Sequence, residues 1–99
     1  MYKDITEIKK ANEEAGHYFF SPDTLQFWGS KVYPRVYGGR YYITSEDNFD
    51  RTAKFYSVRR ADERGHIETV WGFLEFNTLE QAKRAIEALL SDVRQEAGK

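Results

Sequence analysis

The residues best suited to chemistry in this sequence are arginines and lysines interleaved with tyrosines in its middle third. Such side chains can neutralise phosphates and stack on nucleobases, and tyrosine and arginine are also enriched at the energetic centres of protein interfaces. Over residues 31–64, eight basic and five acidic residues give a net charge of +3. Residues 1–30 (three basic, five acidic) and residues 65–99 (four basic, six acidic) each carry −2. We therefore select eight candidate partner-binding residues: Arg35, Tyr37, Arg40, Tyr42, Lys54, Arg59, Arg60 and Arg64.

Three interpretations of this basic, tyrosine-rich segment stay open on the residues alone. The tyrosines can belong to the core while the arginines keep the surface soluble, because a chain with few aliphatic residues needs its aromatic residues for packing. The same side chains can form a face that binds nucleic acid directly. They can also belong to a protein interface, and aromatic residues in excess of what a small core buries would leave an exposed patch. The aromatic residues considered for such a patch are Phe19, Phe20, Phe27, Trp28, Tyr33, Tyr37 and Trp71.

We expect no catalytic, metal-binding or cofactor-binding residues. The only two imidazoles, His17 and His66, lie in predicted turns, and no serine stands in a nucleophile motif. Phosphate-loop, metalloprotease and calcium-loop patterns are absent, and a chain without cysteine has no thiolate ligands. We therefore predict a non-enzymatic protein that binds a macromolecular partner through the basic segment. A protein is the favoured partner, and direct binding of nucleic acid by the same face is the alternative.

The length of 99 residues predicts a single domain over residues 1–99. A chain of this size buries roughly two-thirds of its unfolded surface, which is enough for one core without disulfides. No apolar run approaches the roughly 18 residues that a membrane span needs, and the charged N-terminus is unlike a secretory signal. We therefore expect a cytoplasmic protein that does not contact a membrane.

Capping signals predict three helices. In each case an oxygen-bearing side chain stands just before a run of apolar residues at helical spacing, where it can accept a backbone N–H of the first turn. The predicted helices, each given with its N-cap residue, span residues 5–15 (Asp4), 22–28 (Ser21) and 79–93 (Thr78).

The third predicted helix carries one apolar stripe, so it must pack on something. The sheet is the candidate, through the face that carries Tyr56, Val58, Val70, Leu74 and Phe76. The stripe on the helix consists of Ala82, Ala85, Ile86, Leu89, Leu90 and Val93.

Alternation of side chains and β-forming residues predict strands over residues 40–45, 54–60 and 67–76. Gly65, three residues after Asp62, favours a tight hairpin between the last two strands. Consecutive strands joined in this way form an antiparallel meander. The predicted fold class is therefore α+β, with two N-terminal helices, three or four antiparallel strands, and a C-terminal amphipathic helix packed on one sheet face.

The stretch RVYGGRYYITSE, residues 35–46, contains a Gly-Gly pair between aromatic residues. Such a pair fits a hairpin turn, because glycine adopts positive φ without steric strain. Pro34 limits the first arm to an edge or to irregular structure, so a plain loop before the strand is the alternative. Our hypothesis is that a turn at Gly38-Gly39 carries four residues towards a partner: Arg35, Tyr37, Arg40 and Tyr42.

The sequence resembles a group of short, poorly characterised proteins and domains of bacteriophages and mobile elements. The resemblance lies in the order of four stretches, EIKKANEEAGHYFFSPDTLQFW, VYGGRYYITSE, YSVRRADERGHIETV and GFLEFNTLEQAKRAI. It implies no catalytic residues. It implies an accessory protein that binds host or phage machinery, including host defence complexes such as CRISPR-Cas.

Overall fold

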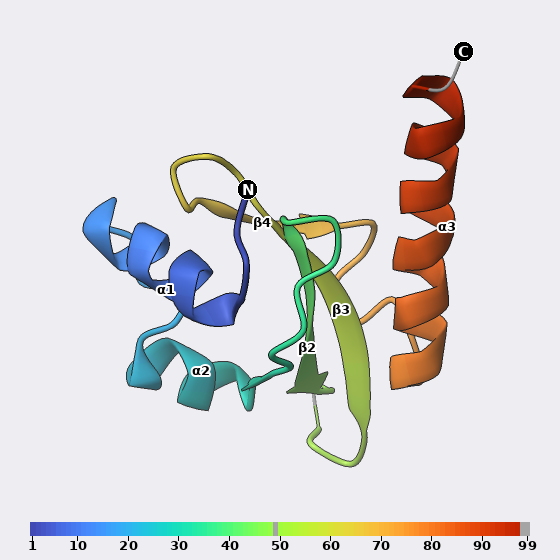
Figure 1. Cartoon of the computed structure of the whole chain (residues 1–99). Coiled ribbons are helices and arrows are strands. Elements are labelled where there is room, and N and C mark those ends of the chain that lie inside the picture. The colour runs from blue at the N-terminus through green and yellow to red at the C-terminus, as the bar shows by residue number, and fades with distance from the viewer. Residues whose placement is uncertain (49, 98–99) are drawn as a thin grey trace.

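The computed structural model describes residues 1–48 and 50–97. Its centre is one antiparallel sheet with the strand order β1-β2-β3-β4. Helices α1 and α2 lie on one face of this sheet and α3 lies on the other (Figure 1). The α+β class and the predicted order of elements are confirmed. The elements are α1 (Ile5–Glu14), α2 (Pro22–Trp28), β1 (Lys31–Val32), β2 (Tyr41–Asp47), β3 (Lys54–Ala61), β4 (Ile67–Val70) and α3 (Leu79–Ala97).

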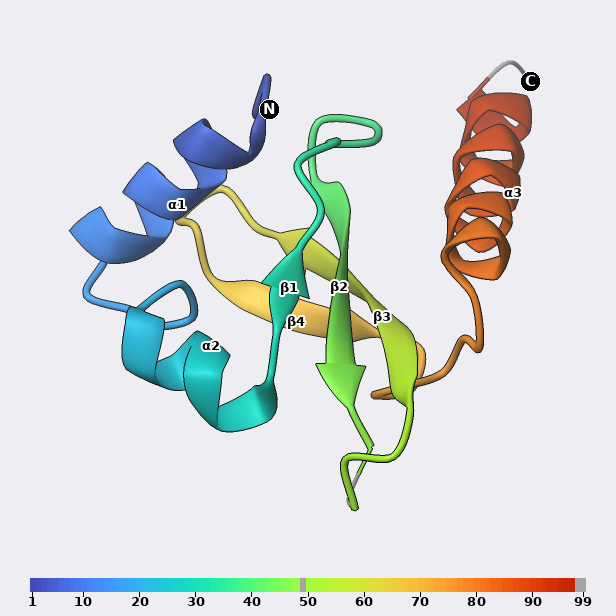
Figure 2. The ribbon, with the colours of Figure 1, turned by 90° about the horizontal axis from the view of Figure 1, so that it is seen from below.

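The sheet is built around the long pairing of β2 with β3, which runs from Tyr41 opposite Arg60 to Asp47 opposite Lys54. β1 is a two-residue edge strand on the outer side of β2 (Figure 2). It stops just before Pro34, which has no N–H to offer a ladder. No helix in the part of the chain that the structure describes is long and apolar enough to cross a membrane.

β4 is shorter than the predicted strand over residues 67–76, because the chain leaves the sheet after Val70. Trp71 and Leu74 both adopt positive φ (61° and 58°), a conformation that cannot continue a strand. The Leu74 N–H donates to the Ser57 hydroxyl at 2.8 Å, which holds this excursion against the sheet. The chain then returns, and Phe76 pairs with Tyr56.

Each predicted N-cap is confirmed by a side-chain hydrogen bond at the start of its helix. Asp4 accepts from the Glu7 N–H at 3.0 Å, and Thr78 accepts from the Gln81 N–H at 3.1 Å. Ser21 accepts from the Thr24 N–H at 3.2 Å. The third helix runs four residues beyond its predicted end.

The α3-side core lies between α3 and the sheet. Most of the predicted sheet face is confirmed there, since Tyr56, Val58, Val70 and Phe76 all pack in it, but Leu74 does not. The helix stripe is shifted from the predicted one: Leu79, Ala82, Ile86 and Leu90 pack in this core, and Leu89 is only half-buried. The side chain of Val93 lies outside the described residues. The buried members of the α3-side core are Tyr37, Ile43, Val58, Ala82 and Ile86.

The α1-side core lies on the opposite face of the sheet. Its buried members are Ile8, Phe20, Tyr42 and Ala61. The buried Asn12 side chain donates to the Gly65 carbonyl at 2.7 Å, and this bond ties α1 to the turn between β3 and β4. Gly65 has a φ of +80°, and a Cβ there would also come within 2.4 Å of the α1 backbone. Glycine is therefore required at this turn for two separate reasons.

Gly38 and Gly39 form the predicted hairpin turn, with φ of 59° and 76°. Tyr37 and Tyr41 close the turn by exchanging two backbone hydrogen bonds of 2.8 and 3.0 Å. Before this turn the chain passes irregularly through Pro34, so the first arm is ragged, as expected.

Candidate partner-binding site

The eight residues selected from the sequence do not form one surface. Tyr37 belongs to the α3-side core and Tyr42 to the α1-side core, on opposite faces of the sheet. Tyr42 has no exposed surface and Tyr37 only 5 %. The expectation that the Gly38-Gly39 hairpin carries these two rings towards a partner is therefore wrong, because the sheet is covered on both faces.

Most of the selected cations are paired with carboxylates, which reduces the positive potential that the sequence suggested. Arg40 lies 3.5 Å from Glu63, and Lys54 lies 3.1 Å from Asp47. Arg60 donates to Glu68 at 2.7 Å across the β3–β4 ladder. Arg64 and Arg35 are exposed, and the Arg35 guanidinium stacks 4.5 Å from the centre of the Tyr37 ring.

Arg59 differs from the other selected cations because it is buried, with 8 % of its surface exposed. Its Nη2 lies 3.3 Å from Oε1 of Glu46, a carboxylate with no exposed surface. Its Nε donates to the Thr44 hydroxyl at 3.0 Å, and its Nη1 donates to Thr69. Ser30 donates to the other oxygen of Glu46 at 2.9 Å. The charge of Arg59 is thus neutralised inside a hydrogen-bonded network.

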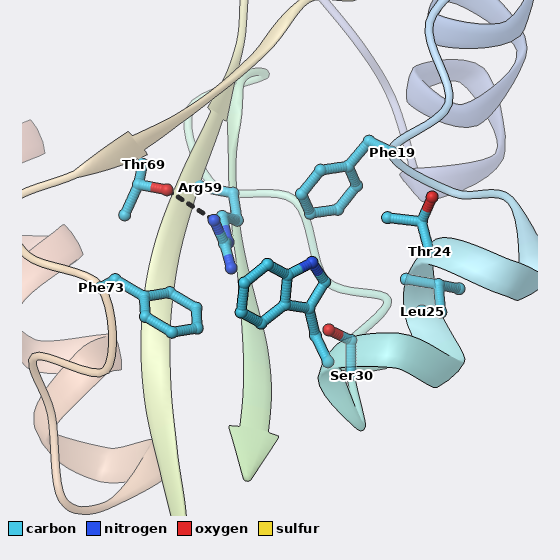
Figure 3. A pocket seen from close by; sticks show the side chains of 8 residues that line it. Phe19, Thr24, Leu25, Ser30, Arg59, Thr69 and Phe73 are labelled. Carbon is cyan, nitrogen blue, oxygen red and sulfur yellow. Dashed lines mark hydrogen bonds between the residues drawn. The ribbon is translucent and has the colours of Figure 1, made fainter. Parts of the chain in front are cut away.

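A cleft of about 280 Å³ lies above Arg59, between α2 and the chain that follows β4. We call it the Arg59 cleft. Phe19 and Phe73 stand on either side of the guanidinium (Figure 3), with ring centres 5.2 and 5.5 Å from its central carbon. The floor is therefore polar but neutral overall, and the walls are aromatic. The lining residues are Phe19, Thr24, Leu25, Trp28, Ser30, Arg59, Thr69 and Phe73.

Three exposed aromatic side chains, Phe27, Trp28 and Phe73, form a continuous ridge beside this cleft. The Phe27 and Trp28 rings are 5.0 Å apart, and the Trp28 and Phe73 rings are 5.7 Å apart. Their exposed fractions are 70 %, 50 % and 46 %. A second cleft of about 400 Å³, which also contains Asp47 and Arg51, adjoins the far side of this aromatic ridge.

An exposed aromatic patch was one of the three interpretations that the sequence left open, and exposed aromatic side chains do gather at the aromatic ridge. Phe27 and Trp28 were among the residues considered for it. Phe73 was not. It was assigned to the predicted strand over residues 67–76, but β4 ends before it. The positive φ at Trp71 and Leu74, which the sequence did not signal, directs Phe73 to this surface.

The chain belongs to DUF7447, a family of unknown function. The match covers residues 4–87, which include both clefts and the whole aromatic ridge. No curated protein and no solved structure matches the chain.

The two histidines of this DUF7447 member, which are 49 positions apart in sequence, lie side by side with ring centres 5.2 Å apart. From the sequence, each was expected to be a turn residue without a catalytic role. Their surroundings are an open cleft that also contains Asn12, Phe19 and Ile67, which we call the His cleft. Among the residues that the structure describes, no three metal-ligating side chains gather at one point.

Proposed function

We propose that this protein is a non-enzymatic binding module that docks a partner protein through the aromatic ridge and the two clefts beside it. The observation that carries the proposal is the continuity of three half-exposed aromatic rings between two clefts. Exposed apolar patches of this kind mark interaction sites, and aromatic residues dominate the energetics of protein interfaces. Burying one such ring on binding contributes about 1.5–3 kcal/mol.

The chemistry of the Arg59 cleft supports binding rather than catalysis. Ser30 and Thr24 supply hydroxyls there, but the carboxylate that Ser30 contacts is already engaged by Arg59. An activated nucleophile needs an adjacent base that is free to take its proton. The imidazoles that could serve as bases lie in the adjoining His cleft, which Thr24 also lines. Among the described residues, the Thr24 hydroxyl is hydrogen-bonded to Ser21 and not to either imidazole.

The resemblance to short phage and mobile-element proteins gives the class of partner that we propose. The partner would be a component of host or phage machinery, and a host defence complex such as CRISPR-Cas is one example of that class. An accessory protein of this type needs only a rigid scaffold and a docking surface. The sheet, which is packed on both faces, suits the role of scaffold, and the aromatic ridge suits the role of docking surface.

Direct binding of nucleic acid is the alternative, and the pairing of the cations makes it the weaker one. Affinity for nucleic acid comes chiefly from cations that replace counterions on the phosphates. Arg40, Lys54, Arg59 and Arg60 each have a carboxylate partner. Of the six cations selected from the sequence, Arg35 and Arg64 remain exposed without an ion pair among the described residues.

The test of the proposed function compares two equally exposed tryptophans. Trp28 is 50 % exposed in the aromatic ridge, and Trp71 is 48 % exposed with its ring against Phe76. The partner is the protein that co-purifies with the tagged chain from extracts of its native host, and its affinity is then measured with purified components by calorimetry. We expect Trp28→Ala to weaken binding by about tenfold or more, as at an interface hot spot, and Trp71→Ala to change it by less than about threefold.

Unchanged affinity in both Trp28→Ala and Phe73→Ala would contradict the proposed function. The nucleic-acid alternative is tested separately by titrating single-stranded and duplex DNA and RNA at two salt concentrations. Affinity that falls steeply with salt, and that is reduced in Arg35→Ala and Arg64→Ala, would favour that alternative.

A further inference from the structure

β4 forms an open edge of the sheet beside the Arg59 cleft. In the described part of the chain it pairs only with β3, and the strand order places it last. Glu68 and Thr69, in its centre, are exposed. An open edge presents unpaired backbone N–H and C=O groups to any extended chain that approaches.

The alternation of backbone hydrogen bonds along β3 shows which backbone groups of β4 point away from the sheet. Tyr56 exchanges two backbone hydrogen bonds with Phe76, so its polar groups point towards the β4 side of β3. Backbone direction alternates along a strand, and β3 therefore bonds β4 through the pairs Val58–Val70 and Arg60–Glu68. The N–H and C=O groups of Ile67 and Thr69, on the alternate positions, point away from the sheet.

The side chains of Ile67 and Thr69 lie on the same sheet face as the Arg59 cleft and the His cleft. Thr69 lines the Arg59 cleft and Ile67 lines the His cleft. A strand added to this edge would place alternate side chains on that face, about 7 Å apart. Ile67 and Thr69 are two positions apart, which is also the interval between alternate side chains of an added strand. One extended peptide could therefore bond the outward backbone groups of both residues and direct side chains towards the Arg59 cleft and the His cleft.

We propose that an extended segment of the partner protein adds to β4 as a fifth strand and directs an apolar side chain into the Arg59 cleft. This inference rests on the proposed function and specifies its binding mode. In such strand addition the main-chain hydrogen bonds supply affinity and side-chain pockets supply specificity. An apolar side chain suits the cleft because its walls are aromatic and Glu46 neutralises Arg59.

A second copy of the chain is a poorer occupant of this edge than a partner segment. Two copies could pair their β4 edges in antiparallel orientation through the outward backbone groups of Ile67 and Thr69. Ile67 of one copy would then lie opposite Thr69 of the other. That register places Glu68 directly opposite Glu68 of the other copy, and like charges facing each other destabilise a ladder. Nucleic acid is disfavoured because it has no backbone pattern of alternating amide donors and acceptors.

The probe for this inference is a displayed library of random dodecapeptides, selected on the wild-type protein. Thr69→Pro removes the outward N–H without touching the β3–β4 ladder, and proline is tolerated at such an edge position. Thr69→Ala is the matched control, because it removes the same hydroxyl and keeps the N–H. We expect selected peptides to carry an apolar anchor and to bind Thr69→Pro about tenfold more weakly than Thr69→Ala.

Amide hydrogen exchange of the wild-type protein gives a second readout that needs no variant. In the free protein the Ile67 and Thr69 amides should exchange faster than those of Glu68 and Val70, and bound peptide should slow them. Unprotected amides in the complex, equal binding to the two Thr69 variants, or no enriched peptide would overturn the inference. A wild-type dimer in sedimentation that Thr69→Pro converts to a monomer would also overturn it and assign the edge to a second copy.

The proposed function and this inference can fail separately. If the natural partner loses affinity with Trp28→Ala but binds Thr69→Pro normally, the aromatic ridge is the docking surface and strand addition is wrong. If selected peptides depend on the Thr69 N–H while Trp28→Ala has no effect on the natural partner, the edge binds extended chains and the proposed function is wrong.

Discussion

At the scale of single residues, Arg59 and Glu46 form an ion pair inside the protein. Both are buried, and their ion pair is supported by Thr44, Thr69 and Ser30. Removing one member of a buried pair leaves a charge that neither water nor a partner can solvate. Because Arg59 also lines the Arg59 cleft, a change in this pair should alter both the stability of the sheet and the floor of the cleft.

We predict that Glu46→Ala lowers the free energy of unfolding by about 3–5 kcal/mol, because Arg59 is left buried without its partner. The double variant Glu46→Leu with Arg59→Met should lose less than the single variant, since it removes both charges and keeps the volume. Urea denaturation measures both. A loss in the double variant larger than that of Glu46→Ala would contradict this account.

Asp62 provides a pH-dependent contribution to stability at the turn between β3 and β4. Its carboxylate accepts the backbone N–H of His66 and that of Arg64, both at 2.9 Å. These bonds, chiefly the one from His66, lower the pKa of Asp62. Because the pKa is lower in the folded state, this contribution is complete above the unfolded pKa near 3.9 and is lost as pH falls through the folded pKa.

We predict that NMR titration will place the Asp62 pKa below its usual value. Asp62→Asn keeps an oxygen acceptor for both N–H groups but cannot titrate, so it serves as the control. Its unfolding free energy should fall less between neutral and acid pH than that of wild type. A normal or raised Asp62 pKa would contradict the prediction.

At the scale of elements, α3 shows how a broad apolar stripe is narrowed by its packing partner. Six residues were predicted to form the stripe, but the contacts with the sheet centre on Ala82, Ile86 and Leu90. Leu89 lies beside this line and is half-buried. The sheet thus contacts mainly the central row of this helix face, and Leu89 in a flanking row stays partly solvated.

We predict that Ile86→Ala lowers the free energy of unfolding by about 2–5 kcal/mol, because it opens a cavity in the α3-side core. Leu89→Ala should cost only about 1 kcal/mol, since less apolar surface is withdrawn from water there. The denaturant midpoints of the two variants measure the difference. Equal losses would show that the helix is seated on the sheet differently.

At the scale of the whole molecule, a single sheet supports two cores on opposite faces. Adjacent residues of β2, such as Tyr42 and Ile43, belong to different cores. Because the strands are common to both, neither core can be lost while the other remains. The sheet should therefore unfold in one cooperative transition.

We predict that Ile8→Val and Ile86→Val each cost about 0.5–1.5 kcal/mol and that the double variant costs their sum within about 0.5 kcal/mol, since the two sites share no side-chain contact. Far-ultraviolet circular dichroism and tryptophan fluorescence should report the same unfolding midpoint in all three variants. Separate midpoints would show that the two cores unfold independently.

The sequence by itself determined the local features of this protein. The three N-caps, the glycine turns and the strands β2 and β3 depend on interactions within a few residues, and each lies at or within two residues of where the pattern predicts it. β4 is the exception, because it ends six residues before its predicted end. Composition also raised, as one of three open interpretations, that aromatic residues exceed what the core can bury. Phe27 and Trp28 of the aromatic ridge were identified on that basis.

The tertiary structure alone decided which side chains face a partner. Alternation assigns Tyr42 and Ile43 to different faces of a strand, but it does not say that helices cover both faces. Covering both faces buried Tyr37, Tyr42 and Arg59, which the sequence had suggested as surface residues. The early end of β4, its open edge and the exposure of Phe73 likewise depend on contacts between distant segments, such as the hydrogen bond from Leu74 to Ser57. Those contacts form only when the whole sheet assembles, so no local pattern could contain them.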